Sequence, residues 1–289
     1  MTKQEFQQLV ASGTVILDGA TGSNLMKRGM PRGVVTEQWI LEHPQVLLQL
    51  QREYVAAGSQ IIYAPTFSAN RYSLGRHGLE KDTRQMNYAL LTLSKEAAAG
   101  KALVAGDMTT TGVPLEPNGT MTYQTLFEIY QEQAEALKDA DVLVVETMLG
   151  IDETAVAVEA AQSVCDLPVM CSLTVQTDGG LYFGGNCVEA VETLQAVGAS
   201  AVGINCSYGP EQLVSLVRNM KTVSKVPLLV KPNAGMPVIS DEGEAVYPME
   251  PHEFAAHMQV LIREGADIVG GCCGTTPQFI AALYKEIYG

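Results

Sequence analysis

Residues 141–148 read DVLVVETM, a short run of β-branched and other apolar residues that ends in a carboxylate, Glu146. A run of this length between turn residues is typical of a strand that is buried on both faces. Seven similar runs recur along the chain: VILDGA (15–20), SQIIYAPTF (59–67), ALVAGDM (102–108), PVMCSLTV (168–175), SAVGINC (200–206), PLLVKPNA (227–234) and DIVGGCCG (267–274). Each run predicts one strand.

Helical patterns separate these runs. Residues 44–57 begin with a proline suited to a first helical turn, carry a helical stripe of apolar residues and end before a glycine. Thr122 is typical of the N-cap of a further helix. The same periodicity is seen in residues 153–164, 188–197 and 211–223.

Alternating strands and helices predict parallel strands with helices on both faces of the sheet. Eight such units fit one (β/α)₈ TIM barrel that forms a single domain over residues 1–289. An open, doubly wound sheet is the alternative fold. The turn DGATGSN that follows the first run lacks the GxGxxG pattern typical of that fold, so the barrel is favoured.

The composition excludes several classes of partner. The formal net charge is −14 at pH 7, and an acidic surface repels the phosphates of nucleic acids. The N-terminal stretch MTKQEFQQLV has no signal-peptide core, and no apolar run approaches the ~18 residues of a membrane span. We therefore expect a cytoplasmic protein without nucleic-acid or membrane partners, in which cysteine thiols stay reduced.

Polar side chains stand where the eight runs end. In barrel enzymes the catalytic groups lie at the carboxyl ends of the strands. The candidates here are Asp18, Thr66, Asp107, Glu146, Thr174, Asn205, Cys206, Asn233, Cys272 and Cys273. Any one of them has an ordinary alternative role as a turn residue, but a whole ring of polar strand ends indicates an active site.

Three of the six cysteines are candidates for a shared site. Cys206 closes the sixth run, whereas Cys272 and Cys273 close the eighth, so all three would face the same mouth of a barrel. Adjacent side chains on a strand point to opposite faces, and the glycines at positions 270, 271 and 274 would let the backbone leave the extended form. The alternatives are a vicinal disulfide and a chance pair of cysteines.

The other three cysteines, Cys165, Cys171 and Cys187, fit the role of small buried hydrophobic residues.

Three thiolates suit a soft or borderline metal ion, most simply Zn²⁺. The sequence offers no fourth ligand at metal-like spacing, and three protein ligands with an open position are typical of catalytic zinc. An ion with three thiolates is a poor Lewis acid for hydrolysis, but it would hold an incoming thiol as a nucleophilic thiolate. This pattern favours alkyl transfer to sulfur.

The thiol substrate needs groups that orient it. Asp18 and Glu146, at the ends of two strands, would hold an ammonium group by charge-assisted hydrogen bonds, or else act as a general acid and base. The backbone N–H groups of the DGATG turn would receive a carboxylate. A molecule with a thiol, an ammonium and a carboxylate is an amino-acid thiol.

The chain resembles the homocysteine S-methyltransferase family over essentially its whole length, through LDGATGS, GINCS, PNAGMP and GGCCGTTP in that order. The resemblance implies a methyltransferase with a (β/α)₈ barrel, a zinc ion held by Cys206, Cys272 and Cys273, and methylation of homocysteine to methionine. It also implies contacts of Asp18 and Glu146 with the substrate amino group. The residues that it implies for the rest of the pocket are Ala20, Thr66, Phe67 and Asn205.

Within the family the chain is most similar to the N-terminal homocysteine-binding module of cobalamin-dependent methionine synthase, through YPMEPHEFA, PNAGMP and the glycine after Cys273. We therefore expect the methyl group to come from outside this chain, as methylcobalamin on a separate corrinoid protein. A small donor such as S-methylmethionine or betaine is the alternative, and the chain would also fit a fragment of a longer synthase.

One stretch departs from the family pattern, because APTFSAN (64–70) stands where TNTFGAN is usual. Ala64 and Pro65 remove a hydroxyl and an amide from the predicted mouth. Two functions of other kinds also remain: a non-catalytic module that docks zinc or a corrinoid protein, and a donor-side barrel that demethylates folate or a methylamine. The presence of both carboxylates and all three sulfurs favours the thiol methyltransferase.

Overall fold

The computed structural model describes residues 1–239 and 245–289. Eight strands form one sheet in the order β1-β10-β7-β6-β5-β4-β3-β2, and every neighbouring pair in it is parallel. The strands are β1 (Val15–Ile16), β2 (Ile61–Tyr63), β3 (Leu103–Thr109), β4 (Val142–Met148), β5 (Val169–Leu173), β6 (Ala201–Asn205), β7 (Leu228–Lys231) and β10 (Ile268–Val269). A parallel bridge between Leu17 and Ile61 joins the two ends of the sheet, so the predicted (β/α)₈ barrel is confirmed.

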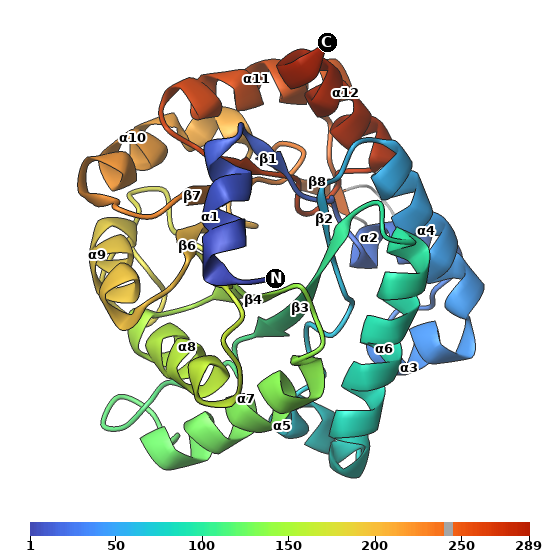
Figure 1. Ribbon diagram of the computed structural model, residues 1–289, viewed down its shortest axis with the longest axis vertical. Coiled ribbons are helices and arrows are strands. Elements are labelled where there is room, and N and C mark those ends of the chain that lie inside the picture. The colour runs from blue at the N-terminus through green and yellow to red at the C-terminus, as the bar shows by residue number, and fades with distance from the viewer. Residues whose placement is uncertain (240–244) are drawn as a thin grey trace.

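Helices surround the barrel on its outside (Figure 1). The helices that follow β1 are α2 (Gly22–Lys27), α3 (Thr36–Glu42), α4 (Pro44–Ala56), α5 (Arg71–Gly75), α6 (Thr83–Ala98), α7 (Tyr123–Leu137), α8 (Ile151–Val164), α9 (Cys187–Val197), α10 (Val214–Val223), α11 (Pro251–Arg263) and α12 (Pro277–Tyr288), with 3₁₀ turns η1 (Glu80–Asp82) and η2 (Pro210–Gln212). In the part of the chain that is described, no helix is long and apolar enough to cross a membrane.

The expected helices are present with small shifts at their starts. Pro44 takes the first turn of α4, and the Thr122 hydroxyl accepts the N–H of Thr125 at the start of α7. The helix expected from residue 211 begins instead at Val214, because Pro210–Gln212 forms a separate 3₁₀ turn.

The strands alternate between two cores, as period-2 side chains must. Val142 and Val144 of β4 face the barrel interior, whereas Leu143 and Val145 pack against the outer helices. The same alternation directs Glu146 into the interior at the carboxyl end of the strand.

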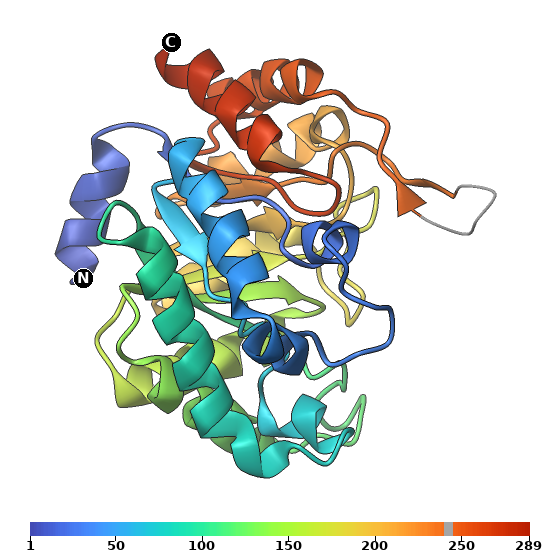
Figure 2. The ribbon, with the colours of Figure 1, turned by 90° about the vertical axis from the view of Figure 1, so that its right-hand side faces the viewer.

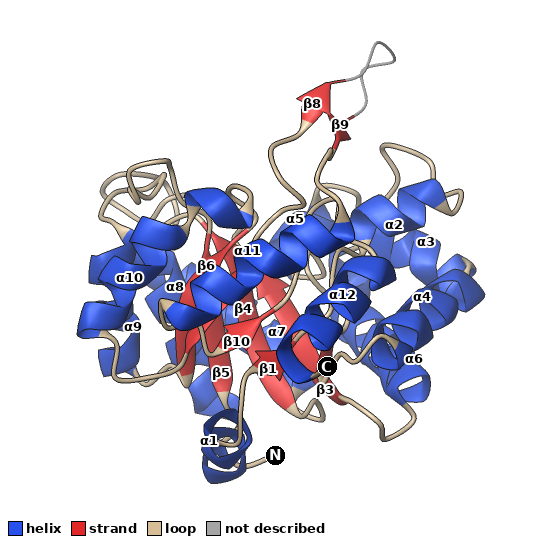
Figure 3. Ribbon diagram, turned by 90° about the horizontal axis from the view of Figure 1, so that it is seen from above, coloured by secondary structure: helices blue, strands red, loops and turns tan. Residues whose placement is uncertain are grey.

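The two ends of the barrel differ. Helix α1 (Lys3–Ala11) begins with a capping box between Thr2 and Glu5, and its fully buried Phe6 belongs to the interior core. This helix lies across the amino-terminal end of the strands (Figure 3). The hairpin of β8 (Val238–Ile239) and β9 (Ala245–Val246) projects from the other end, away from α1 (Figure 2). The interior is therefore closed at its amino-terminal end.

Candidate active site

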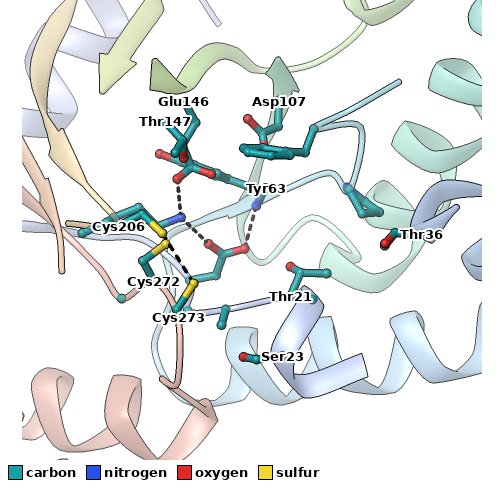
Figure 4. Close-up of a pocket in the computed structure, with 18 of the residues that line it drawn as sticks. Thr21, Ser23, Thr36, Tyr63, Asp107, Glu146, Thr147, Cys206, Cys272 and Cys273 are labelled. Atoms are coloured by element: carbon teal, nitrogen blue, oxygen red, sulfur yellow. Dashed lines mark hydrogen bonds and ion pairs between the residues drawn. The ribbon is translucent and has the colours of Figure 1, made fainter. Parts of the chain in front are cut away.

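The sulfur atoms of Cys206, Cys272 and Cys273 meet at the carboxyl end of the barrel (Figure 4). All three lie within 4.8 Å of one another, and the Cys206 and Cys273 sulfurs are 3.4 Å apart. Cys206 follows β6 directly and has a left-handed backbone with φ +53°, a strained conformation typical of functional sites. Among the described residues, Cys165, Cys171 and Cys187 take no part in this cluster.

The glycines around the cysteine pair act in two different ways. Strand β10 ends at Val269, and Gly274 has φ +83°, which only glycine adopts at little cost. Gly270 and Gly271 have no such φ. A Cβ atom at Gly270 would lie 2.8 Å from the Asp18 carbonyl oxygen, and one at Gly271 would lie 2.5 Å from Oγ1 of Thr275. Gly274 therefore supplies a backbone conformation that favours glycine, whereas Gly270 and Gly271 supply room for close packing.

The cysteine cluster fits a cation. Hydrogen bonds from the thiols of Cys206 and Cys272 lower the pKa of Cys273 to about 3, whereas hydrogen bonding within the cluster and burial raise the pKa values of Cys206 and Cys272. Tetrahedral zinc with Zn–S bonds of about 2.3 Å places its sulfurs about 3.8 Å apart. The 3.4 Å between the Cys206 and Cys273 sulfurs and the 4.8 Å upper limit for all three pairs are compatible with that value, so the donor type and the spacing both suit such an ion.

A cavity of about 360 Å³ opens beside the cysteines. Of the predicted site residues, its lining includes Asp18, Ala20, Phe67 and Glu146 together with the three cysteines. Ala64 and Pro65, the residues that depart from the family pattern, also line it. The structure therefore brings to one cavity seven of the nine residues predicted as metal ligands or substrate contacts. Of the other strand-end candidates, Asp107 lines the cavity, whereas Thr174 and Asn233 do not.

The other two predicted residues, Thr66 and Asn205, are fully buried behind the cavity wall. The Thr66 hydroxyl donates to the carbonyl oxygen of Asp107 at 2.7 Å. The Asn205 amide donates to the Thr147 hydroxyl at 2.7 Å, accepts the Thr147 N–H at 3.1 Å and lies 3.9 Å from the Cys272 sulfur. Thr147 has φ +58°, so Asn205 holds a strained residue next to the thiols.

Lys231 lines the same cavity but is not among the residues predicted from the sequence. It is 3% exposed, and its Nζ lies 3.1 Å from Oε1 of Glu146 and 3.4 Å from Oδ1 of Asp18. The same nitrogen lies 3.7 Å from the centre of the Tyr63 ring, a cation–π contact. The alternation of side chains along a strand could have predicted its position. Leu229 of β7 faces the interior, so Lys231, two residues later, must face it too.

Charge pairing keeps this buried group ionised. Burial lowers the pKa of Lys231, but the charges of Glu146 and Asp18 outweigh burial and raise that pKa well above its usual value. Burial raises the pKa of Asp18 to about 6, against the opposing effects of Lys231 and the Tyr63 N–H. The cavity therefore contains a paired ammonium and carboxylates a short distance from the cysteines.

Comparisons with known proteins show the family of this chain. Residues 15–287 match the family model for homocysteine S-methyltransferase. The methionine synthase of Mycobacterium leprae is 30% identical over 97% of this chain, and the chain spans 25% of that protein. The S-methylmethionine–homocysteine S-methyltransferase of Pongo abelii is 29% identical over 99% of this chain and 82% of that protein.

Among solved structures, the metallated form of the homocysteine methyltransferase MmuM from Escherichia coli has a similar fold. Its TM-score is 0.82 at 24% identity, over 96% of this chain and 98% of that one. The fold and the site together define a (β/α)₈ barrel protein with three convergent cysteines at the carboxyl ends of its strands. The chain belongs to the homocysteine S-methyltransferase family, whose members are methyltransferases.

Proposed function

We propose that this protein transfers a methyl group to the thiol of homocysteine, forming methionine, and that Cys206, Cys272 and Cys273 hold a zinc ion for this reaction. The observation that carries the proposal is the convergence of three sulfurs from β6 and β10 beside one cavity. Family membership over residues 15–287 supports the acceptor and the reaction class.

A zinc ion bound there would keep the substrate thiol deprotonated and nucleophilic near neutral pH. A bond forms between that sulfur and the methyl carbon, while the bond from the methyl carbon to its carrier breaks and leaves its electron pair on the carrier. The thiol proton goes to solvent. The reduced cysteines that this chemistry needs fit a cytoplasmic location.

The remaining cavity residues would position the acceptor. Asp18 and Glu146 are the residues that the family resemblance assigns to its amino group, and here they already share their charge with Lys231. Ala20 and Phe67 would contact its carbon chain from the cavity wall. The Ala20 N–H already donates to Oγ1 of Thr275 at 3.1 Å, so it is engaged within the protein. Thr66 and Asn205 would act indirectly, by fixing residues at the ends of β3 and β4.

For the methyl donor, we propose methylcobalamin carried by a separate corrinoid protein. The similarity to a methionine synthase, of which the chain spans about a quarter, supports this choice. A small sulfonium donor, S-methylmethionine, is the second candidate. It is favoured by the similarity to the S-methylmethionine-using relative, which extends over 82% of that protein. Betaine is a further small donor of the same reaction type.

Zinc-loaded protein would be incubated with homocysteine and, in separate reactions, with methylcobalamin, S-methylmethionine, betaine or methyl-folate. Mass spectrometry of the product identifies the donor. Methionine formed from methylcobalamin is the expected result, and a corrinoid protein should raise that rate. Methionine formed only from S-methylmethionine or betaine would replace the corrinoid donor by a small molecule. Homocysteine binding without methionine from any donor would indicate a non-catalytic module.

A further inference from the structure

The carboxylates of Asp18 and Glu146 already have partners inside the protein. Oδ2 of Asp18 accepts the Tyr63 N–H at 2.8 Å, while Oδ1 of Asp18 and Oε1 of Glu146 both face the Nζ of Lys231. An N–H or the Lys231 ammonium thus lies beside three of the four oxygen atoms of the pair. The place where a substrate ammonium would bridge the two carboxylates is occupied by the ammonium of Lys231.

The position of Lys231 is fixed from several sides. Its side chain is 4% exposed, and its ammonium lies on the face of the Tyr63 ring in addition to the two carboxylates. Water therefore screens this charge very little. A second ammonium next to it would meet the like charge of Lys231, which offsets part of its attraction to Asp18 and Glu146. The α-ammonium of an amino-acid thiol would therefore gain less here than beside two unpaired carboxylates.

We propose that Lys231 is a specificity-determining residue whose ammonium replaces that of the substrate, so that the acceptor class is mercaptocarboxylates with or without an α-amino group. Homocysteine is one member of this class, and 4-mercaptobutanoate is its counterpart without the amino group. The inference rests on the proposed function, because it assumes that a thiol enters the metal site formed by the three cysteines.

The test measures binding and does not depend on turnover. Protein loaded with Co²⁺ in place of zinc would be titrated with homocysteine and, separately, with 4-mercaptobutanoate, and the thiolate-to-cobalt absorption would give the two dissociation constants. In the wild type we expect constants within tenfold of each other. In Lys231→Met the vacated carboxylates should bind the substrate ammonium, and the ratio should shift at least tenfold in favour of homocysteine.

Two matched variants serve as controls. Lys231→Arg keeps a cation at this position and should keep the wild-type ratio. Lys221→Met removes a lysine whose ion pair with Asp267 lies on the surface, and it should leave the ratio unchanged. A purely structural role of Lys231 would weaken the binding of both thiols together and leave their ratio as it was.

The outcomes separate this inference from the proposed function. A wild-type preference for homocysteine above tenfold overturns the inference while leaving thiol methylation intact. An unchanged ratio in Lys231→Met overturns it as well. If that variant does not fold, the wild-type ratio decides alone. If neither thiol alters the cobalt absorption, the proposed function and the inference both fail.

Discussion

The sulfur atoms of Cys206 and Cys273 lie 3.4 Å apart although 67 positions separate them in the sequence. The closed barrel produces this contact, because β6 and β10 both flank β7 and end at the same mouth. Neither strand provides a metal site by itself. The cluster therefore exists only when the barrel is folded, so binding of the proposed zinc ion would be coupled to folding.

Replacing Cys206 with alanine should remove the bound metal. Two thiolates that follow one strand hold zinc far more weakly than three, so we expect less than about one tenth of the wild-type zinc content after dialysis against a weak chelator. Metal analysis by plasma emission gives the readout. Cys165→Ala at the end of α8 is the control and should retain full zinc content. Full zinc content in Cys206→Ala would contradict the proposed ligand set.

Gly274→Ala should weaken metal binding more than a comparable glycine replacement elsewhere. Gly274 has φ +83°, and a Cβ atom there would lie 2.3 Å from the Tyr247 ring, which borders Cys273. Gly112 has φ +74° with open space around its Cβ position, so Gly112→Ala isolates the backbone cost of about 1 kcal/mol. Both variants should lose stability in chemical denaturation, but only Gly274→Ala should lose zinc. Equal zinc content in the two variants would exclude a role for this packing.

Asn205→Ala should disturb the thiols without removing a ligand. The change leaves the Thr147 N–H without its acceptor and takes a donor away from Cys272. We expect a loss of about 1–3 kcal/mol in the free energy of unfolding, and zinc affinity lowered about 10- to 100-fold. Competition with a chromophoric chelator measures the affinity. Asn219→Ala, on the exposed face of α10, should match the wild type in both measurements.

Asp18 should make stability depend on pH in the acidic range. Burial raises its pKa from 3.8 to about 6, so between these values the folded protein keeps a proton that the unfolded chain releases. The stabilisation is present below pH 4 and is lost as pH rises through about 6, by about 3 kcal/mol at most. Asp18→Asn cannot titrate. The stability of the wild type relative to Asp18→Asn should therefore decrease from pH 4 to pH 7 in chemical denaturation.

An exposed aspartate is the control for this pH series. Asp166→Asn should give a stability curve parallel to that of the wild type over the same range. If the wild type and Asp18→Asn also run parallel, the carboxyl of Asp18 titrates equally in the folded and unfolded chains, and the prediction is wrong.

The sequence was sufficient to predict the barrel and the cysteine cluster because both follow from local rules. Apolar runs such as DVLVVETM define strands, and closure brings the ends of all strands to one mouth, wherever they lie in the chain. The strand assignment of Cys206 and the position of Cys272 and Cys273 after the last strand were thus enough to predict their convergence. No comparable rule predicted the projecting hairpin of β8 and β9, which is no part of the barrel.

Lys231 could not be recognised from the general behaviour of its residue type, because lysine is almost never fully buried unless it is paired. Its partner Asp18 follows β1 and its partner Glu146 lies in β4. No spacing in the sequence indicates that these residues form ion pairs with Lys231. Gly270 and Gly271 illustrate a similar limit. Their contacts with Asp18 and Thr275 arise only after the barrel closes, so from the sequence they were indistinguishable from flexible turn residues.

Because Phe6 and α1 close the amino-terminal end of the barrel, the acceptor and the donor of the proposed reaction would both enter at the carboxyl-terminal end. In the proposed reaction the methyl donor would lie between the acceptor sulfur and the solvent while the new bond forms. A donor bound at this opening would cover the thiol, so the acceptor would bind before the donor and the methylated product would leave after the spent donor.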